Sequence, residues 1–332
     1  MTITAEFDRP VHDRSTASDA ASGPSPDPRF ARDVAEGLSR AQKTVPSRWL
    51  YDEAGSVLFE RITTLPEYYP TRTETAILEA HAHAMLDGAG SGAVVVEYGA
   101  GASIKTRLLL DACEHPALYV PLDVSDAFDA DIDESLRARH PSLEVRHVAG
   151  DFLDPQALPL DGVPGTRAGL FLGSTIGNLE DDEIARFLTH ARASLGTGSR
   201  LLIGVDVRKD AATLEAAYDD AAGVTARFDL NLLVRMNREL GADFDIDGFK
   251  HEARWDGTLS RIEMHLVAVR AQRVRIGSTV HRFAAGESIR SEISRKFGPD
   301  DVQALAREHG WRAGGRWTDA GGLFSVVRLD AS

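Results

Sequence analysis

The residues with the clearest chemical signature form the segment EYGAG, which runs from Glu97 to Gly101. This segment follows the β-branched run 94–96 and precedes an apolar-periodic helix, so the chain must turn sharply at Gly99 and Gly101. A helix that begins after such a turn offers free backbone N–H groups to a ligand. The pattern predicts a binding site for a nucleotide-type cofactor at the end of a strand.

The third glycine of the dinucleotide-phosphate fingerprint is missing, because Ile104 stands where G-x-G-x-x-G requires it. A pyrophosphate-bearing cofactor, and with it a nicotinamide-dependent oxidoreductase, is therefore disfavoured. Glu97, and Asp123 at the end of the next expected strand, suit a ligand with ribose hydroxyls and a cationic amino-acid end. S-adenosyl-L-methionine meets that description. From this motif alone, a strand-to-helix turn whose glycines serve only packing stays open.

The elements that must position these residues alternate in type along the middle of the chain. Strand-like segments are expected at 117–125, 143–152, 168–179 and 199–207. Helical stretches such as 181–195 separate them, which is typical of a parallel sheet covered on both faces. Ligands of such sheets bind beyond the carboxyl ends of the strands. The residues expected at those ends, in loops that converge with the glycine turn, are Asp123, Asp151, Phe152 and Asn178.

The rest of the chain departs from this alternation. Residues 1–28 are rich in Ser, Pro, Asp and Ala and are expected to form a disordered tail. A small helical lobe is expected up to Arg72, and Thr73 is expected to cap the next helix. After Asp206 the pattern predicts an inserted lobe with long helices and two or three antiparallel strands. A helix at 300–310 and a closing hairpin then complete the large sheet, and a cleft between the lobes suits a small ligand.

The composition of the chain argues against several classes of protein function. The 332 residues, 43% of them apolar, suffice for one large α/β domain plus a second lobe. A formal charge of −14 argues against nucleic acid, and no membrane span or signal sequence is evident. The single cysteine, Cys113, rules out an internal disulfide and fits a reducing compartment. We expect a cytoplasmic monomer without a metal site, since His81 and His83 point to different faces of a helix.

Six segments carry a resemblance to a known family, and they span most of the chain. They are WLYDEAGSVLFERITTLPEYYPTRTE, EYGAGASIKTR, FLGSTIGNL, AYDDAAGVTARFDLNLLVRMNRELGADFD, RIEMHL and SEISRKF. From about Arg32 to Leu329 the chain resembles the L-histidine Nα-methyltransferases of ergothioneine biosynthesis. The resemblance implies an α/β fold with a Rossmann-like SAM-dependent methyltransferase domain at 73–208 and 299–332. It also implies a second, inserted α+β substrate-binding domain at 29–72 and 209–298.

The resemblance also implies a site, residue by residue. Together with Glu97 and Gly101 of the turn, the cofactor-binding residues would be Tyr51, Gly99, Lys105, Asp123, Asp151 and Phe152. The substrate imidazole would be held by Tyr68, Glu292 and Ser294, and its carboxylate by Asn178 and Tyr218. The pocket around the amino group would be shaped by Phe59, Gly173 and Met264.

The implied reaction is three methyl transfers from S-adenosyl-L-methionine to the α-amino group of L-histidine, giving hercynine. Such in-line displacements require alignment and exclusion of water, and they need neither a metal nor a covalent nucleophile. Tyr51 is the candidate for orienting the amine and accepting or passing its proton. The substrate would be L-histidine and its mono- and dimethylated forms.

Other readings stay open at this point. The acceptor could be another amino acid or a small amine, against which the pair Glu292 and Ser294 argues. A non-catalytic binding module that keeps the pocket is a further alternative. Asp219 and Asp220 resemble paired catalytic carboxylates, but beside Tyr218 they are expected to cap or solvate a helix.

Overall fold

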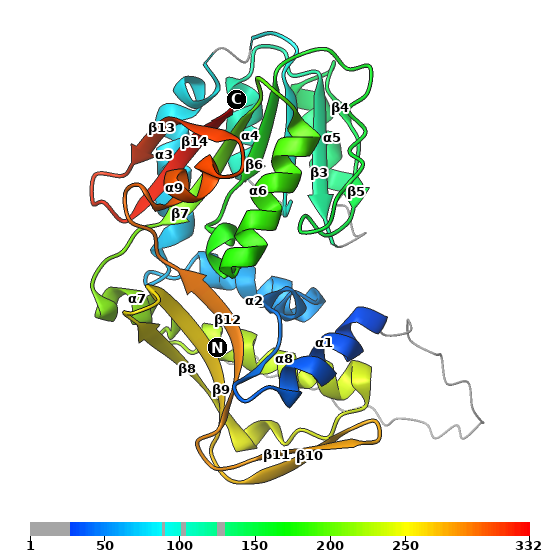
Figure 1. Cartoon of the computed structure of the whole chain (residues 1–332), viewed down its shortest axis with the longest axis vertical. Helices are drawn as coiled ribbons and strands as arrows, with labels where there is room; N and C mark the ends of the chain where they lie inside the picture. Colours follow the sequence, from blue (N-terminus) through cyan, green and yellow to red (C-terminus); the bar gives the residue numbers. More distant parts are fainter. Residues whose placement is uncertain (1–26, 88–89, 101–103, 125–129) are drawn as a thin grey trace, which may run out of the picture.

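The computed structural model describes residues 27–87, 90–100, 104–124 and 130–332. Two stacked lobes make up this part of the chain (Figure 1). The large lobe contains the longer sheet, and the small lobe contains a shorter sheet with its own helices. Residues 1–26 of the predicted tail lie outside the described residues, while Asp27 and Pro28 already cap and begin the first helix.

The described strands of the large lobe form an eight-stranded sheet in the order β13-β14-β7-β6-β2-β3-β4, with β5 also paired to β3. Its strands are β2 (Val94–Tyr98), β3 (Leu118–Asp123), β4 (Glu144–Val145), β5 (Val148–Ala149), β6 (Arg167–Phe171), β7 (Arg200–Asp206), β13 (Trp311–Thr318) and β14 (Phe324–Ala331). β2 to β7 pair in parallel, while β14 runs antiparallel to β7 and to β13. β2 is buried along its whole length, as expected of a strand covered on both faces.

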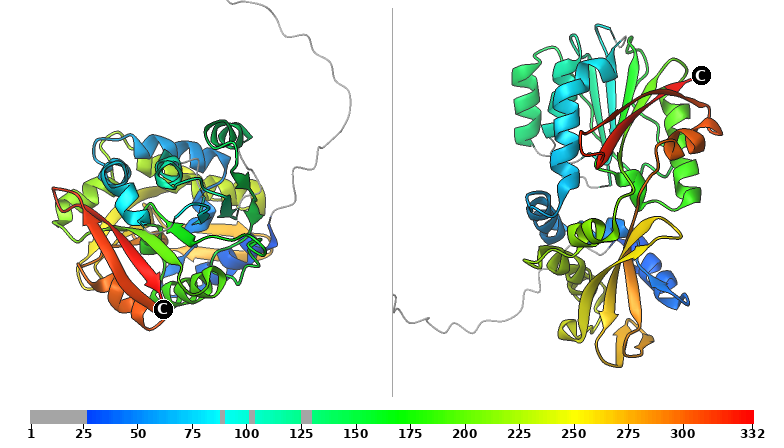
Figure 2. Two further views of the ribbon diagram at one scale, coloured as in Figure 1. Left: turned by 90° about the horizontal axis from the view of Figure 1, so that it is seen from above. Right: turned by 90° about the vertical axis from the view of Figure 1, so that its left-hand side faces the viewer.

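Helices cover both faces of this sheet (Figure 2). They are α3 (Tyr69–Leu86), α4 (Ile104–Ala112), α5 (Ala130–Arg139), α6 (Asp181–Leu195) and α9 (Asp301–Arg307). One hydrophobic cluster joins α3, α4 and α5 to one face, and a second joins α6 and α9 to the other. The predicted α/β fold class is confirmed, whereas the expected strand at 143–152 is two short strands, β4 and β5.

The small lobe is built on a four-stranded sheet in the order β1-β12-β9-β8. Its elements are α1 (Pro28–Ser39), β1 (Lys43–Thr44), η1 (Ser47–Leu50), α2 (Glu53–Thr63), α7 (Ala211–Tyr218), α8 (Val224–Leu240), η3 (Ile246–Gly248), β8 (Phe249–Asp256), β9 (Arg261–Ala268), β10 (Gln272–Ile276), β11 (Thr279–Phe283) and β12 (Ser288–Arg295). The expectation of two or three antiparallel strands was incomplete. The segment before α2 adds β1, parallel to β12, and β10 with β11 forms a separate hairpin.

Two predicted helix ends can be compared with the structure. α3 begins at Tyr69 rather than after Thr73, and Tyr68 at its N-cap makes no side-chain cap bond. Pro70 in the first turn has a backbone already set for a helix, which explains the earlier start. Asp220 does cap a helix, since its carboxylate accepts hydrogen bonds from the first two N–H groups of α8.

The chain passes between the lobes before α3, after β7 and after β12 (Figure 1). The carboxyl ends of β2, β3, β6 and β7 therefore face the small lobe, and the turn η2 (Thr175–Asn178) after β6 packs against β12. The predicted lobe boundary at residues 72/73 falls inside α3. Among the described helices, none has the length and apolar character that a membrane span requires.

Candidate active site

The glycine turn lies at the carboxyl ends of β2 and β3. Gly99 has a φ of +75°, and its N–H donates to the carbonyl oxygen of Leu122 at 2.9 Å. Only glycine adopts that backbone without strain. A Cβ atom at this position would lie 3.7 Å from the Phe152 ring, so the turn and the ring border the same space. Gly101 lies outside the described residues.

Glu97 lies below this turn. It is buried, its Oε2 atom accepts hydrogen bonds from the hydroxyls of Thr106 and Tyr119, and burial raises the pKa of its carboxyl group. These contacts join β2 to β3 and α4. The structure therefore places Glu97 beside the turn in a structural role, and a contact with the cofactor stays a prediction.

A fully buried carboxylate, Glu74 on α3, connects two predicted site residues. It pairs with Lys105 of α4 at 2.6 Å. Its two carboxylate oxygens also accept the backbone N–H of Gly173, at 3.0 and 2.9 Å. Gly204 on β7 leaves room for this carboxylate, because a Cβ atom there would lie 1.9 Å from its Oε1. Lys105 and Gly173 are thus held together through Glu74.

The loops after β3 and β5 meet at the same edge of the sheet. The Gly150 N–H donates to the carbonyl oxygen of Asp123 at 2.8 Å, which holds Asp151 beside the end of β3. Phe152 packs edge-on against Phe171, with ring centroids 5.1 Å apart. The Asp151 carboxylate accepts a hydrogen bond from Arg48 of the small lobe at 3.1 Å.

Five aromatic rings of the small lobe and the start of α3 form a cluster, and we call it the aromatic cluster. Its members are Tyr51, Phe59, Tyr68, Tyr218 and Phe228. Tyr51 lies edge-on to both Phe59 and Phe228, with centroids 5.4 Å apart in each pair. Burial, followed by the charge of Glu292, raises the pKa of Tyr51 well above its usual value although 38% of the residue's surface is exposed. Its hydroxyl is therefore a neutral phenol at physiological pH.

Glu292 on β12 lies close to this cluster. It is 8% exposed, and its Oε2 atom has no hydrogen-bond partner among the described residues. Burial first, and then the negative charge of Asp229, raise the pKa of Glu292 to about 8. A β-bulge between Arg290 and Glu292 shifts the pairing with β9 and leaves Met264 opposite Glu292. This buried, unpartnered carboxyl oxygen can accept a ligand N–H.

Ser294 and Tyr218 meet beside Glu292. Their hydroxyl oxygens lie 2.7 Å apart, and either hydroxyl can be the donor. Both are buried, and both accept hydrogen bonds from the Lys296 ammonium, at 2.8 Å to Ser294 and 2.9 Å to Tyr218. The pair lies at the end of β12, where it can face a polar group of a substrate.

A buried ion pair between His251 and Asp229 lies next to Tyr218. His251 Nδ1 lies 2.7 Å from the Asp229 carboxylate, and its Nε2 lies 2.8 Å from the carbonyl oxygen of Tyr218. Both of those partners accept hydrogen bonds, so both ring nitrogens carry protons and His251 is an imidazolium. Burial lowers its pKa, but Asp229 outweighs that effect and the net shift is upward.

Asn178 is the last residue of η2, half-buried at the lobe junction. The preceding residue, Gly177, lies so close to β12 that a Cβ atom would approach the Arg295 carbonyl oxygen to 2.8 Å. Close contact between η2 and β12 thus places Asn178 near the strand that carries Glu292 and Ser294.

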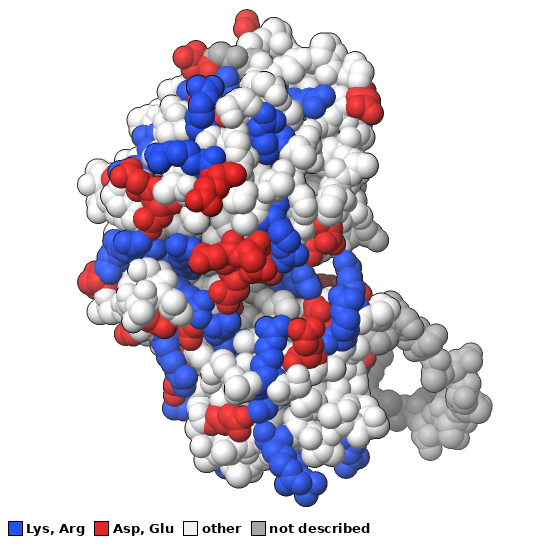
Figure 3. Space-filling view, in the orientation of Figure 1, with Lys and Arg blue, Asp and Glu red and all other residues white. Residues whose placement is uncertain are grey.

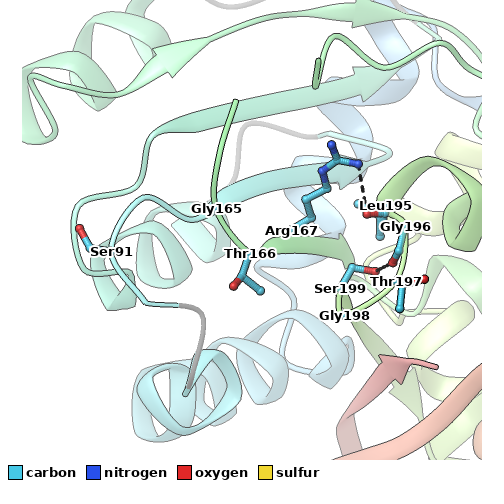
Figure 4. Close-up of a pocket in the computed structure, with 9 residues that line it drawn as sticks. All are labelled: Ser91, Gly165, Thr166, Arg167, Leu195, Gly196, Thr197, Gly198 and Ser199. Atoms are coloured by element: carbon cyan, nitrogen blue, oxygen red, sulfur yellow. Dashed lines mark hydrogen bonds between the residues drawn. The ribbon is translucent and has the colours of Figure 1, made fainter. Parts of the chain in front are cut away.

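A cavity of about 520 Å³ lies elsewhere, at the amino ends of β6 and β7 (Figure 4). It is lined by Ser91, Gly165, Thr166, Arg167, Leu195, Gly196, Thr197, Gly198 and Ser199. Arg167 donates to the carbonyl oxygens of Ser194 and Leu195 at the end of α6, and so acts as a helix C-cap. Because ligands of such sheets bind at the carboxyl ends of the strands, we assign the active site to those strand ends, where they face the small lobe, and not to this cavity.

Comparison with known proteins decides the family. The profile of the family described as "Histidine-specific methyltransferase, SAM-dependent" matches residues 30–331. The chain belongs to this family. It is a SAM-dependent methyltransferase, so the predicted cofactor and enzyme class are confirmed and the nicotinamide-dependent alternative was wrong.

Two relatives of this methyltransferase are named histidine N-alpha-methyltransferase. The Mycolicibacterium smegmatis protein is 45% identical over 302 residues, which cover 89% of this chain and 92% of the relative. The Mycobacterium tuberculosis protein is 44% identical over 303 residues, with the same coverage of each chain. A solved Burkholderia thailandensis 1,6-didemethyltoxoflavin-N1-methyltransferase, with bound S-adenosylhomocysteine, has 14% identity and a TM-score of 0.45 and covers 88% of this chain and 93% of its own.

The structure brings the predicted residues of the methyltransferase together in two groups. At the carboxyl ends of the large sheet lie Glu97, Gly99, Lys105, Asp123, Asp151, Phe152, Gly173 and Asn178. In the small lobe and at the start of α3 lie Tyr51, Phe59, Tyr68, Tyr218, Met264, Glu292 and Ser294. Their contacts with ligands stay predictions.

Sequence reasoning missed several residues around the site of the methyltransferase. They are Glu74, Phe228, Asp229, His251 and Lys296. Four of the five lie within the segments TRTE, ARFDLNLL or SRKF that carry the resemblance, but a motif does not say which side chains meet. The sequence signal that could have pointed to Lys296 is its charge, two residues after the predicted site residue Ser294.

Proposed function

We propose that this methyltransferase transfers three methyl groups from S-adenosyl-L-methionine to the α-amino nitrogen of L-histidine, which makes hercynine for ergothioneine biosynthesis. Family membership over residues 30–331 supports histidine as the acceptor. So does the name of the two relatives at 44% and 45% identity. A relative called ergothioneine biosynthesis protein 1, from Schizosaccharomyces pombe, is 31% identical over 285 residues and supports the pathway.

The observation that carries the proposal is the unpartnered Oε2 atom of Glu292. A buried acceptor without a donor destabilises the protein until a ligand supplies an N–H group. An imidazole supplies one N–H and one bare ring nitrogen. Glu292 would accept the former, and the hydroxyl of Ser294 would donate to the latter. Apolar side chains leave both groups unpaired and bind more weakly, and a glutamine-like amide would fit worse than an imidazole.

The residues around the glycine turn fit the proposed cofactor. Gly99 keeps the space beside Phe152 free, where a Cβ atom would approach that ring to 3.7 Å. The half-buried carboxylate of Asp123, at the end of β3, suits two vicinal ribose hydroxyls. Phe152 offers a ring face to adenine. When bound, the cofactor supplies a methyl group on a sulfonium, which an amine displaces in line.

Tyr51 would orient the amine. Its pKa is raised by burial, so the hydroxyl stays neutral and accepts a hydrogen bond from the amine instead of acting as a phenolate base. The amine reacts as its free base, and each of the first two transfers leaves an ammonium that must lose a proton. Tyr51 can pass that proton only by giving its own to solvent water, which its 38% exposed surface reaches.

The aromatic cluster suits the products of successive transfers. Ring faces attract a cation more strongly as it becomes less hydrated, which favours retention of methylated intermediates. Phe59 and Phe228, on either side of Tyr51, provide such faces. The third transfer gives a quaternary ammonium without a proton to lose, which ends the reaction.

We also propose that 29–72 with 209–298 is the substrate-binding domain, and that 73–208 with 299–332 is the methyltransferase domain. One hydrophobic cluster joins α1, η1, α2, α7 and α8 to the four-stranded sheet, which supports this division. The start of α3 contributes Tyr68 and Tyr69 to that cluster. The methyltransferase would act as a monomer in the cytoplasm, without nucleic acid or membrane. Light scattering after gel filtration tests the monomer.

The experiment that tests the function is mass spectrometry of the purified protein with S-adenosyl-L-methionine and each of the twenty amino acids. We expect one, two and then three methyl groups on histidine, and none on the others. Methylation of a different amino acid or of a small amine would overturn the acceptor while keeping the cofactor. Absence of any methylation, with measurable cofactor binding, would contradict the proposed function as a whole.

A further inference from the structure

Lys296 follows β12 and is fully buried. Its ammonium donates to Ser294 Oγ at 2.8 Å and to Tyr218 Oη at 2.9 Å, and it pairs with Asp206 Oδ2 at 2.8 Å. An ammonium has three N–H donors and no acceptor, so these three oxygens use all of them. Its position over the Tyr218 ring, 4.5 Å from the centroid, adds a cation–π contact.

Counting protons shows what this arrangement does to the hydroxyl pair. Ser294 and Tyr218 each accept one hydrogen bond from Lys296, and one of the two hydroxyl protons forms the 2.7 Å bond between them. One hydroxyl proton is left, and it has to point away from Lys296. A neutral amine at 296 could accept from the pair instead, and then no outward proton would remain.

Asp206 favours the ammonium form. This carboxylate is fully buried, at the end of β7, and it also accepts the Tyr69 hydroxyl at 2.8 Å and the Lys209 ammonium. Burial lowers the pKa of Lys296, and the Asp206 charge opposes that shift. Tyr69, Asp206, Lys209 and Lys296 lie where the chain passes between the lobes, so the hydroxyl pair is anchored to the lobe junction.

We propose that Lys296 is a positioning residue that makes the Ser294–Tyr218 pair a hydrogen-bond donor toward the substrate side chain. The proposal rests on the proposed function, because it assumes that this pair faces histidine. With Lys296 in place, Tyr218 donates to Ser294, and Ser294 offers its own proton to the bare ring nitrogen, while Glu292 takes the ring N–H. The substrate carboxylate is then held by Asn178 and not by the Tyr218 hydroxyl, which departs from the role that the resemblance implies for Tyr218. Lys296 does not touch the substrate and acts through Ser294 and Tyr218.

The test compares Lys296→Met with Lys209→Met. Both variants remove one ammonium from Asp206, but Lys209 makes no hydrogen bond to Ser294 or Tyr218. In each variant the other lysine still pairs with Asp206, so neither leaves this carboxylate without a cation. We expect Lys296→Met to raise the KM for histidine at least tenfold with kcat within threefold of the parent. Lys209→Met should keep the KM within threefold, and the Kd for S-adenosyl-L-methionine should be unchanged in both.

A second readout separates positioning from a general loss of structure. β-(2-thienyl)alanine has a ring of similar size without nitrogen, so its inhibition constant against histidine should not change in Lys296→Met. In a Ser294→Ala background, Lys296→Met should raise the KM by no more than threefold, because the hydroxyl it positions is gone. If Lys296→Met does not fold, Lys296→Arg keeps the charge but not the compact three-donor geometry, and the same rise in KM is expected.

The outcomes separate the two proposals. If the parent enzyme does not methylate histidine, the proposed function fails first. If it does, equal KM values for Lys296→Met and Lys209→Met overturn the role of Lys296 alone. A full effect of Lys296→Met in the Ser294→Ala background, or an equal loss of thienylalanine binding, overturns it too.

Discussion

One buried oxygen of Glu292 has no hydrogen-bond partner in the described part of the chain, and under the proposed function an N–H group of the substrate would satisfy it. Glu292→Ala removes this acceptor. We expect it to raise the KM for histidine about a hundredfold or more, consistent with about 3 kcal/mol for a hydrogen bond to a charged group. The Kd for S-adenosyl-L-methionine, measured by calorimetry, should change less than twofold. Equal losses for both ligands would remove Glu292 from the substrate pocket.

The pKa of Glu292 also predicts a pH dependence. Its pKa is raised to about 8, so below that pH the carboxyl carries a proton that it must lose to accept an imidazole N–H. The substrate amine must lose a proton as well. Between the ordinary imidazole pKa of about 6.5 and the pKa of Glu292, where the substrate ring is already neutral, log kcat/KM for histidine should therefore rise with a slope approaching 2 per pH unit. Glu292→Gln removes one ionisation, so its slope should be near 1, and an unchanged slope would contradict the assignment.

At the residue scale, the sequence could predict the chemistry at Glu292, Ser294 and Tyr218 because a family pattern marks them. It could not predict that Lys296 meets Asp206, 90 residues away along the chain, or that Glu74 meets Gly173. Such contacts depend on how the elements pack, and no local spacing encodes them. Gly99 was predictable from the sequence, because glycine is the residue type that adopts a positive φ most readily.

At the scale of elements, α3, β6 and β7 meet around Glu74. Gly204→Ala would place a Cβ atom 1.9 Å from the Glu74 carboxylate, which is fully buried and could move only by breaking its bonds to Lys105 and the Gly173 N–H. We expect a loss of about 2 kcal/mol or more in the free energy of unfolding. Gly257→Ala, in a turn after β8 with its nearest contact at 3.3 Å, is the control and should cost less than half as much. Urea denaturation measures both, and equal losses would argue against a special role for Gly204.

The alternation of strands and helices made the large sheet predictable, because β-branched runs such as 94–96 can be buried on both faces only there. The small lobe was less predictable. β1 has two residues and forms only by pairing with β12, which lies more than 240 residues later. The start of α3 was misplaced because Thr73 is a good cap by type, whereas Pro70 sets the first turn.

At the scale of the whole molecule, ion pairs join side chains of the two lobes. Arg48 of the small lobe joins Asp33 to Asp151, and Glu180 at the start of α6 accepts Arg261 and Arg290. On the face shown in Figure 3, basic and acidic side chains are interspersed, without one continuous basic field. At the lobe junction the acidic groups of Asp151 and Glu180 are thus paired with arginines.

Arg48→Met tests how much the two pairs that Arg48 makes, with Asp33 inside the small lobe and with Asp151 across the junction, contribute together. The pair with Asp151 is partly exposed, at 33% for Arg48, so we expect a loss of up to about 1 kcal/mol in the free energy of unfolding. Arg40→Met breaks only the exposed pair between the C-cap Arg40 and Glu36 at the end of α1, and it should lower the free energy of unfolding by no more than about 0.3 kcal/mol. The loss for Arg48→Met should shrink in high salt, and a loss that is independent of salt would point to packing instead.

The fit between Glu74 and Gly204 has a consequence for how this enzyme can change over generations. Any side chain at 204 collides with the carboxylate at 74, so substitution at 204 is accessible only after position 74 has become smaller. If residue 74 becomes shorter first, Lys105 and the Gly173 N–H lose their carboxylate partner. A protein with only this change would still have to fold and work well enough to be kept. Sequences descended from this one should therefore keep both residues or have lost both, and few should carry only one.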